Sequence, residues 1–306
     1  MSKTIKIGTR ESQLALWQAN EVKRLLEKNG HQAELVLIKS EGDIDLVTPL
    51  YELGVQGVFT KALDASLLSG HIDIAVHSMK DVPTLLAKGI IQASILPRAS
   101  YTDIIVPKHG TAFLNDMNGV ATIATSSIRR KAQWLNRYPN HSIDNLRGNV
   151  NTRLRKVQEN EWAGAIFAAA GLDRINLRPD NAVVLDWMLP APAQGAVMVV
   201  CREGDTYPYE ACHAFNDEDT AICVQIERDF LRTLLGGCST PISALAKIED
   251  GNLVFRGSVL TLDGKQKAEV SKTVAIDQAK GLGIRMAEEI LNNGGQVIVD
   301  CIRNAG

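Results

Sequence analysis

Through its first two thirds, the chain alternates short β-branched runs with amphipathic helical stretches. Strands are predicted near residues 5–7, 35–38 and 72–76, and helices near residues 14–26 and 59–69. The first helix is indicated by apolar residues at helical spacing, and Gly30 is a plausible stop for it. Because such alternation is typical of βαβ units, we expect an α/β fold with mixed, mainly parallel sheets.

The pattern starts again near Asp103 and later changes character. In this second unit, strands are predicted near residues 120–124, 143 and 165–168, and helices over residues 127–138 and 150–157. From Asp219 a helix leads toward Cys238, followed by strand-like runs at 253–262 and 267–274 and a last helix near 277–291. Two similar α/β units and a small α+β unit are therefore predicted.

Positive charge is concentrated in one segment of an otherwise mildly acidic chain, whose net charge is 33 − 35 = −2. Between residues 129 and 156 only Asp144 is acidic. The cationic residues there are Arg129, Arg130, Lys131, Arg137, Arg147, Arg153, Arg155 and Lys156. Few internal partners are expected for them, and a local field of this kind favours a small polyanionic ligand over a nucleic-acid backbone.

The five cysteines are odd in number and form no C-x-x-C pair, so neither a disulfide framework nor a metal site is expected. No apolar run approaches the length of a membrane span, and the first residues lack the apolar core of a signal peptide. We therefore expect a cytoplasmic protein without a membrane partner.

The segment from Gly8 to Ser12 precedes the first predicted helix. Free backbone N–H groups, the Ser12 hydroxyl and the Arg10 guanidinium could converge there on a carboxylate. The alternative, which local sequence alone favours, is that Ser12 simply caps the helix and Arg10 is solvated.

An apolar strand at residues 73–76 runs into the polar tip His77-Ser78-Met79-Lys80-Asp81. Lys80 and Asp81 would emerge together at its carboxyl end, where a carboxylate near a cation can stabilise positive charge or pass a proton. A solvated turn ended by Pro83 is an equally good interpretation. His77 could be a packed or capping residue.

Two helix starts, at residues 125–130 and 147–153, combine hydroxyls or glycine with arginines. Guanidinium groups grip carboxylates in a bidentate way that lysine cannot, which favours anion binding over solvated helix faces.

Cys238 follows two glycines and precedes Pro241, which describes a tight loop exposing a thiol, although a strained structural position is an alternative. The other cysteines, Cys201, Cys212, Cys223 and Cys301, are expected in the core. Residues 42–57, with three glycines and a proline, are either a loop over a site or a plain surface loop.

Taken together, these segments resemble the porphobilinogen deaminase family. The match follows the same order along nearly the whole chain, and the combination of VHSMKDVP at 76–83 with RGN at 147–149 is highly specific. The remaining matches are Arg10 and Ser12 with LALW at 14–17, TSS at 125–127, AAGL at 169–172, QGA at 194–196 and GGC at 236–238.

The resemblance implies three domains, the first two similar to type II periplasmic binding proteins, with the active site in the cleft between them. We expect the first α/β domain at residues 1–97 plus 195–215, the second at 100–192, and a small α+β domain at 218–306 that carries Cys238. A monomer is expected by the same resemblance.

It also implies a transferase, hydroxymethylbilane synthase, that adds four porphobilinogen molecules to a dipyrromethane cofactor held by Cys238 through a thioether. Each substrate would lose ammonia to give an electrophilic azafulvene, which the free α-carbon of the terminal pyrrole attacks. Water would finally release the linear tetrapyrrole. Because every added pyrrole brings two carboxylates, the cationic surplus has a purpose in this reaction.

The resemblance gives roles to the residues singled out above. Asp81 would be the catalytic carboxylate. The cofactor would be held by Lys80, Ser127, Arg129, Arg130 and Arg147, and the substrate by Arg10, Ser12, Arg153, Arg174 and Gln194.

The chain departs from the family pattern at four positions. Gln56 stands in place of a common lysine, Ala62 and Leu235 in place of frequent glutamates, and Ala193 in place of a customary glycine. We expect altered loop packing or rate rather than lost activity.

Two rival functions are open from sequence. A non-catalytic two-domain carboxylate-binding protein would explain the arginines but would leave Cys238 without a purpose. A thiol-dependent hydrolase would use Cys238 as its nucleophile and would need a partner that sequence does not show.

Overall fold

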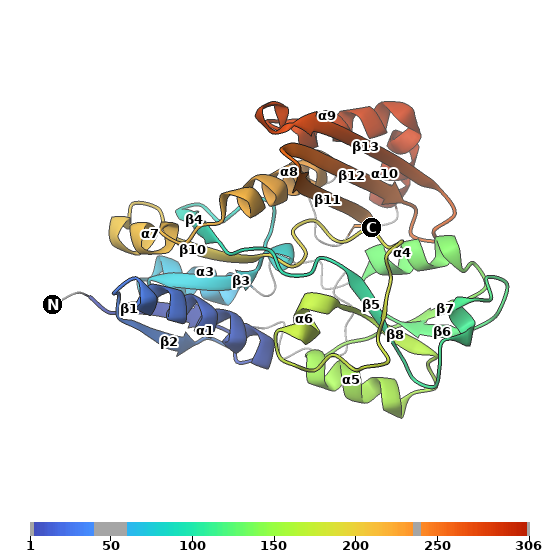
Figure 1. Ribbon diagram of the computed structural model, residues 1–306, viewed down its shortest axis with the longest axis horizontal. Helices are drawn as coiled ribbons and strands as arrows, with labels where there is room; N and C mark the ends of the chain where they lie inside the picture. Colours follow the sequence, from blue (N-terminus) through green and yellow to red (C-terminus); the bar gives the residue numbers. More distant parts are fainter. Residues whose placement is uncertain (1–2, 40–59, 235–239, 305–306) are drawn as a thin grey trace.

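The computed structural model describes residues 3–39, 60–234 and 240–304. Two five-stranded sheets lie side by side, and a three-stranded sheet with its helices packs across both (Figure 1). The fold is therefore α/β, with a smaller α+β part at the carboxyl end of the chain.

The first sheet has the strand order β2-β1-β3-β10-β4. Its elements are β1 (Ile5–Thr9), α1 (Gln13–Lys28), β2 (Ala33–Leu37), α3 (Lys61–Leu68), β3 (Ile74–Ser78), β4 (Ile90–Ile95), β10 (Val197–Arg202) and α7 (Thr206–His213). On one face Val22 and Leu26 of α1 share a core with Cys212 of α7, and on the other Leu63 of α3 packs with Val224 of a later helix. Helices thus cover both faces, as the apolar strands require.

The second sheet repeats the plan, with the order β7-β6-β8-β5-β9. Its elements are β5 (Asp103–Pro107), β6 (Thr122–Ala124), α4 (Ile128–Arg137), β7 (Ser142–Asp144), α5 (Val150–Glu159), β8 (Gly164–Ala168), α6 (Ala169–Asp173) and β9 (Val183–Val184). Val157 of α5 and Leu172 of α6 pack on one face, and Trp134 of α4 packs on the other.

Both sheets are mixed, as expected, but parallel pairing does not predominate. In the first, β1 is parallel to β2 and β3, whereas β10 is antiparallel to β3 and β4. In the second, β6 is parallel to β7 and β8, whereas β5 is antiparallel to β8 and β9. The expectation of mainly parallel sheets is wrong because β10 and β5 run against their neighbours.

The third part contains α8 (Glu218–Leu234), β11 (Ile242–Glu249), β12 (Asn252–Leu260), β13 (Lys267–Ala275), α9 (Leu282–Ile290) and α10 (Gln296–Asn304). The three strands form an antiparallel meander, and the helices bury one of its faces. The sequence had not indicated β11. The predicted helix at 277–291 is also wrong in extent: α9 begins only after Gly281, which has a left-handed φ of 70°.

Two segments connect the first sheet with the second, one leading from β4 to β5 and one returning to β10. They touch at Gly195, whose backbone N–H lies in a turn with φ 89°. A Cβ there would stand 2.7 Å from the Ala99 carbonyl oxygen and 2.8 Å from that of Ser100. Only glycine fits this approach of the two connections.

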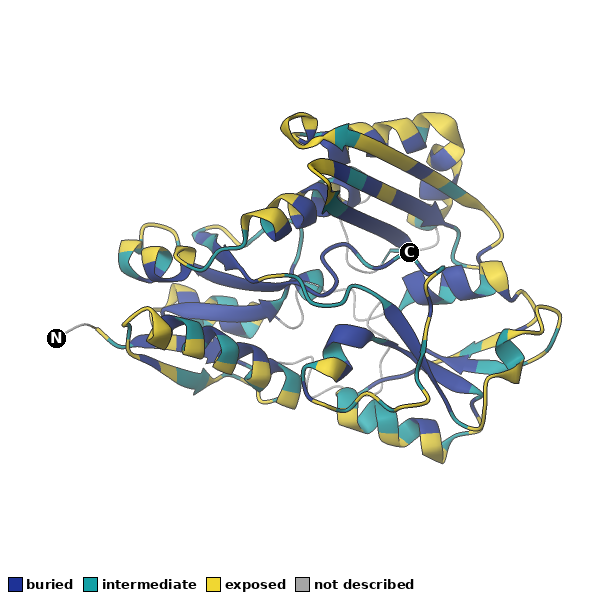
Figure 2. Cartoon of the chain, in the orientation of Figure 1, coloured by how far each residue is buried: buried dark blue, intermediate teal, exposed yellow. Residues whose placement is uncertain are grey.

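Most helices bury one face and expose the other, and the strands of the two five-stranded sheets are largely buried (Figure 2). Cys201, Cys212 and Cys223 are buried, as predicted, but Cys301 is exposed, so a core role for Cys301 is wrong. Among the described residues, no helix is both long and apolar enough to cross a membrane.

Candidate active site

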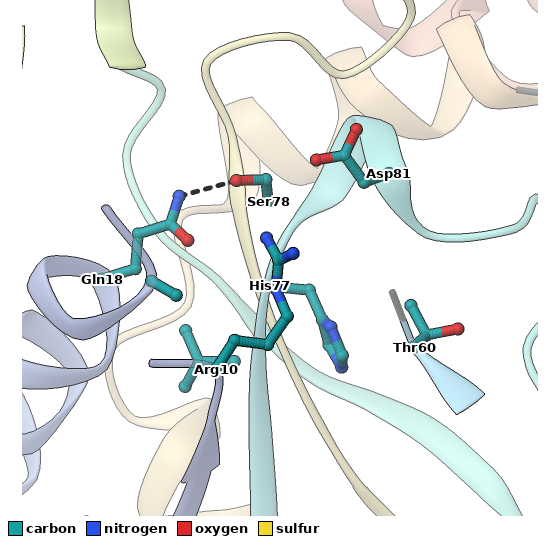
Figure 3. Close-up of a pocket in the computed structure, with 8 residues that line it drawn as sticks. Arg10, Gln18, Thr60, His77, Ser78 and Asp81 are labelled. Atoms are coloured by element: carbon teal, nitrogen blue, oxygen red, sulfur yellow. Dashed lines mark hydrogen bonds between the residues drawn. The ribbon is translucent and has the colours of Figure 1, made fainter. Parts of the chain in front are cut away.

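A small pocket opens where β1 and β3 end, at the edge of the first sheet that faces the second (Figures 1 and 3). It is lined by Arg10, Ala15, Gln18, Thr60, Val76, His77, Ser78 and Asp81. Gln18 of α1 donates a 2.8 Å hydrogen bond to the Ser78 hydroxyl, which ties the helix to the end of β3. Ligands in open α/β sheets usually bind at such strand ends.

The predicted acid and its neighbouring lysine lie on the turn that follows β3. A 3-10 turn spans Met79–Asp81. Met79 is buried, and its N–H donates to the Ala196 carbonyl at 3.0 Å. The turn is therefore held by the residue that directly precedes β10. The buried Met79 therefore fixes the backbone from which the half-buried Lys80 and Asp81 project.

Lys80 is linked to the second sheet through Gln194. The Lys80 ammonium donates to the Gln194 Oε1 at 3.3 Å, and the Gln194 Nε2 donates to Asp103 Oδ1 at 2.9 Å and to the Tyr101 carbonyl at 2.8 Å. Burial, together with the nearby Arg130, lowers the pKa of Lys80 to about 8. Lys80 is thus the one cation of this chain of contacts that changes charge close to neutral pH.

Asp103 pairs with both arginines at the start of α4. It accepts from Arg130 at 2.7 Å and from Arg129 at 2.8 Å, and all three side chains are buried. Burial alone would raise the pKa of Asp103, but Arg129 and Arg130 bring it to about 2. Ser127 caps α4 by accepting from the Arg130 N–H.

These ion pairs correct one step of the sequence argument. Few internal partners were expected for the cationic segment, yet Arg129 and Arg130 share a buried carboxylate that lies outside it. Asp103 was missed as a site residue. The available signal was an aspartate at the start of an otherwise apolar strand, a position where a charge needs a partner.

Arg153 and Arg174 retain capacity for an anion. Each has a buried Nε with no hydrogen-bond partner among the described residues. Burial lowers the pKa of each to about 10, and for Arg153 the neighbouring Arg130 and Arg147 act in the same direction. Both guanidinium groups remain charged at neutral pH, and the acid that acts on Arg153 is Asp81, which raises its pKa.

Arg174 also bridges the two sheets. Its guanidinium carbon lies 5.4 Å from the centre of the Trp17 ring on α1, and it donates to the Gly195 carbonyl at 2.8 Å. Nearby, Asn151 of α5 donates to Gln13 at the start of α1 at 2.9 Å.

At the start of α1, Ser12 caps the helix by accepting from the Ala15 N–H at 3.4 Å, and its contact with a substrate stays a prediction. Arg10 is not simply solvated: it lines the pocket with Asp81 and lowers the pKa of His77, which burial already depresses, to about 4. His77 is therefore neutral at physiological pH.

Cys238, Leu235, Gln56 and the segment 42–57 lie outside the described residues. The expectations for these positions stay predictions. The other predicted site residues follow β1, β3 or α6, stand at or near the starts of α1, α4 and α5, or precede β10; they are Arg10, Ser12, Lys80, Asp81, Ser127, Arg129, Arg130, Arg147, Arg153, Arg174 and Gln194.

Two sheets that meet across paired connecting segments, with buried guanidinium groups at the junction, define a two-lobed class of proteins suited to binding an anionic ligand between the lobes. Among solved structures, the methionine-binding protein MetQ matches at a TM-score of 0.42 and 15% identity, covering 74% of this chain and 96% of its own.

The chain belongs to the porphobilinogen deaminase family. Residues 5–209 match the profile described as "Porphobilinogen deaminase, dipyromethane cofactor binding domain", and residues 221–292 match "Porphobilinogen deaminase, C-terminal domain". Porphobilinogen deaminase of Syntrophotalea carbinolica is 42% identical, covering 97% of this chain and 96% of its own. The chloroplastic porphobilinogen deaminase of Pisum sativum is also 42% identical, covering 95% and 82%.

Membership gives the chain the hydroxymethylbilane synthase activity and the dipyrromethane cofactor of its family, as the motifs had implied. The site fits that cofactor, because a dipyrrole bearing carboxylates supplies an acceptor that the buried Arg129 Nε lacks among the described residues. A non-catalytic carboxylate-binding protein is not favoured.

Proposed function

We propose that this chain condenses four porphobilinogen molecules into a linear tetrapyrrole, with Asp81 as the catalytic carboxylate. One observation carries the proposal: Asp81 projects from the turn after β3 into a pocket shared with Arg10 and lies within electrostatic range of Lys80 and Arg153. Because Asp103 is engaged by Arg129 and Arg130, Asp81 is the acid that can serve a cationic reaction centre while the cations hold the substrate's carboxylates.

Asp81 would accept hydrogen bonds from pyrrole N–H groups. As ammonia leaves the aminomethyl group of the substrate, positive charge spreads into the pyrrole ring, and a carboxylate beside the ring nitrogen stabilises it. The same carboxylate can take up the proton that the ring loses when its aromaticity returns. The neutral His77 is not the general acid at physiological pH, because its pKa lies at about 4.

For the cofactor, we propose attachment through a thioether to Cys238, with carboxylates held by Lys80, Ser127, Arg129, Arg130 and Arg147. When bound, the dipyrromethane supplies the nucleophilic α-carbon of its terminal pyrrole. Support comes from the three buried thiols: burial raises the pKa of Cys201 to about 11 and that of Cys223 to about 12, and it raises the pKa of Cys212 further. Such thiols are poor nucleophiles.

For the substrate, we propose contacts from Arg10, Ser12, Arg153 and Arg174. Gln194 was expected to bind the substrate as well. Because both ends of its amide already have partners in Lys80 and Asp103, we propose that it acts by holding the lysine in place.

We further propose three domains, at residues 1–97 plus 195–215, 100–192 and 218–306, acting as a cytoplasmic monomer without a nucleic-acid or membrane partner. The sheet composition supports the division, since β10 joins the first sheet after the chain has completed the second.

The experiment combines intact mass and turnover. Purified protein should carry a covalent increment equal to a dipyrrole, and Cys238→Ser should lack it, whereas Cys223→Ser should retain it. The loaded protein should consume porphobilinogen and release a linear tetrapyrrole. An unmodified chain that binds porphobilinogen without turnover would instead support the carboxylate-binding alternative.

A further inference from the structure

Arg228 lies in the middle of α8, in the third part of the chain, yet its guanidinium reaches the turn that carries Asp81. The side chain is 7% exposed. It donates to the carbonyl oxygens of Val82 at 3.0 Å and Met79 at 3.4 Å, and through its other terminal nitrogen to that of Pro83. A single arginine thus binds backbone 145 to 149 residues away in sequence.

The three carbonyls enclose the two residues of interest. Met79 precedes Lys80 and Asp81, and Val82 and Pro83 follow them. Within the turn itself, the described backbone bond is from the Val82 N–H to the Met79 carbonyl, at 3.1 Å. The Met79 N–H bond to the Ala196 carbonyl holds the start of the turn, and the guanidinium adds a side-chain restraint on its end.

Arginine suits this position because its donors form a rigid planar fork. Charge-assisted hydrogen bonds of this kind are shorter and stronger than neutral ones, and a buried guanidinium has no water to exchange them for. Lysine could satisfy part of this set from a single nitrogen, and methionine could fill the volume but donate nothing.

Glu227, the residue before Arg228, connects α8 to the segments between the two sheets and to β11. Glu227 is fully buried and accepts from Arg98 at 2.6 Å, from the Ala193 N–H at 2.6 Å and from the Ala246 N–H at 2.7 Å. Arg98 and Ala193 belong to the two segments that connect the sheets. Because α8 is fixed to those segments by Glu227, Arg228 has a firm base from which to hold the turn.

We infer that Arg228 is a positioning residue for the reaction: without touching substrate, it sets where Asp81 and Lys80 stand in the cleft. The inference rests on the proposed role of Asp81. A displacement of about 1 Å at a reacting group can cost about 100-fold in rate. The loss is therefore expected in kcat, since the arginines that bind carboxylates belong to other elements.

The test compares Arg228→Met and Arg228→Lys with Arg232→Met as the matched control. Arg232 lies one turn further along α8, is largely exposed, and pairs with Asp229. In cofactor-loaded, folded protein, we expect Arg228→Met to lower kcat by about 10- to 100-fold and to change KM by no more than about 3-fold. Arg228→Lys should recover part of the lost kcat. Arg232→Met should keep kcat within about twofold of the parent chain.

Intact mass and thermal unfolding establish that each variant is loaded and folded. If Arg228 only supports folding, the melting temperature falls while kcat per loaded site stays near that of the parent chain, and the inference is overturned.

A double-mutant cycle separates this inference from the proposed function. If Arg228 acts through Asp81, adding Arg228→Met to Asp81→Asn costs little more than Asp81→Asn alone. Fully additive losses would refute positioning of Asp81 while leaving its catalytic role intact. Near-normal turnover in Asp81→Asn alone would instead refute the proposed function itself.

Discussion

Arg130 donates to a single carboxylate oxygen of Asp103 through two of its nitrogens, Nε at 3.0 Å and a terminal nitrogen at 2.7 Å. The other oxygen of Asp103 pairs with Arg129 at 2.8 Å. Asp103 thus neutralises part of the cationic cluster from within. It orients two arginines in the first turn of α4.

Replacing Asp103 with asparagine should destabilise the fold, because two buried guanidinium groups would lose their carboxylate. Removing one partner of a buried ion pair typically costs about 3–5 kcal/mol. We expect the free energy of unfolding at pH 7, measured by urea denaturation, to fall by an amount of that order. Asp180→Asn, at an exposed acid of the same domain, is the control.

The same pair predicts a pH dependence. The pKa of Asp103 is lowered from 3.8 to about 2, so its stabilisation is fully present above pH 4 and is lost as pH falls through 2. The difference in unfolding free energy between the parent chain and Asp103→Asn should therefore shrink between pH 4 and pH 2. A difference that stayed constant over that range would contradict the ion-pair account.

Lys80 should impose an alkaline limit on turnover, because it is proposed to hold a carboxylate of the cofactor. Its pKa of about 8 means that the protonated, carboxylate-binding form is lost as pH rises through that value. We expect kcat of the loaded protein to fall above pH 8, and Lys80→Arg to remove that fall because arginine stays charged. Steady-state kinetics from pH 6.5 to about 9.5 check this; an unchanged fall of kcat in Lys80→Arg would assign the effect to another group.

Ala193 replaces a customary glycine and adopts a left-handed φ of 61°. A side chain costs about 1–2 kcal/mol there, part of which glycine would return through its greater freedom in the unfolded chain. Ala193→Gly should therefore leave the unfolding free energy equal or raise it by up to about 1 kcal/mol. Ala196, three positions further along the chain, lacks a positive φ, so Ala196→Gly should lose stability. A loss of stability in Ala193→Gly would refute the strain.

Local periodicity predicted those elements in which one face carries the core. In α1, Val22 and Leu26 lie on the buried face that their spacing indicates. The β11 strand was not predicted because its residues alternate less clearly between buried and exposed than those of β12. The break at Gly281 shortened the last predicted helix, since a left-handed residue cannot continue an α-helix.

Some of the site residues could be predicted from the sequence, and others could not. Motifs identified Asp81 and the arginines because the family pattern retains them in order. Asp103 and Arg228 were missed because their partners lie 27 and about 146 residues away, and no spacing rule relates such positions before the fold is known. Long-range side-chain contacts of this kind are set by the packing of domains.

The most direct test of the central claim is the turnover of the Asp81→Asn variant in protein shown by intact mass to carry the dipyrrole increment. Loaded Asp81→Asn should lose about 100-fold or more in kcat, whereas loaded Asp180→Asn should match the parent chain. Near-normal turnover in loaded Asp81→Asn would contradict the assignment of Asp81 as the catalytic carboxylate.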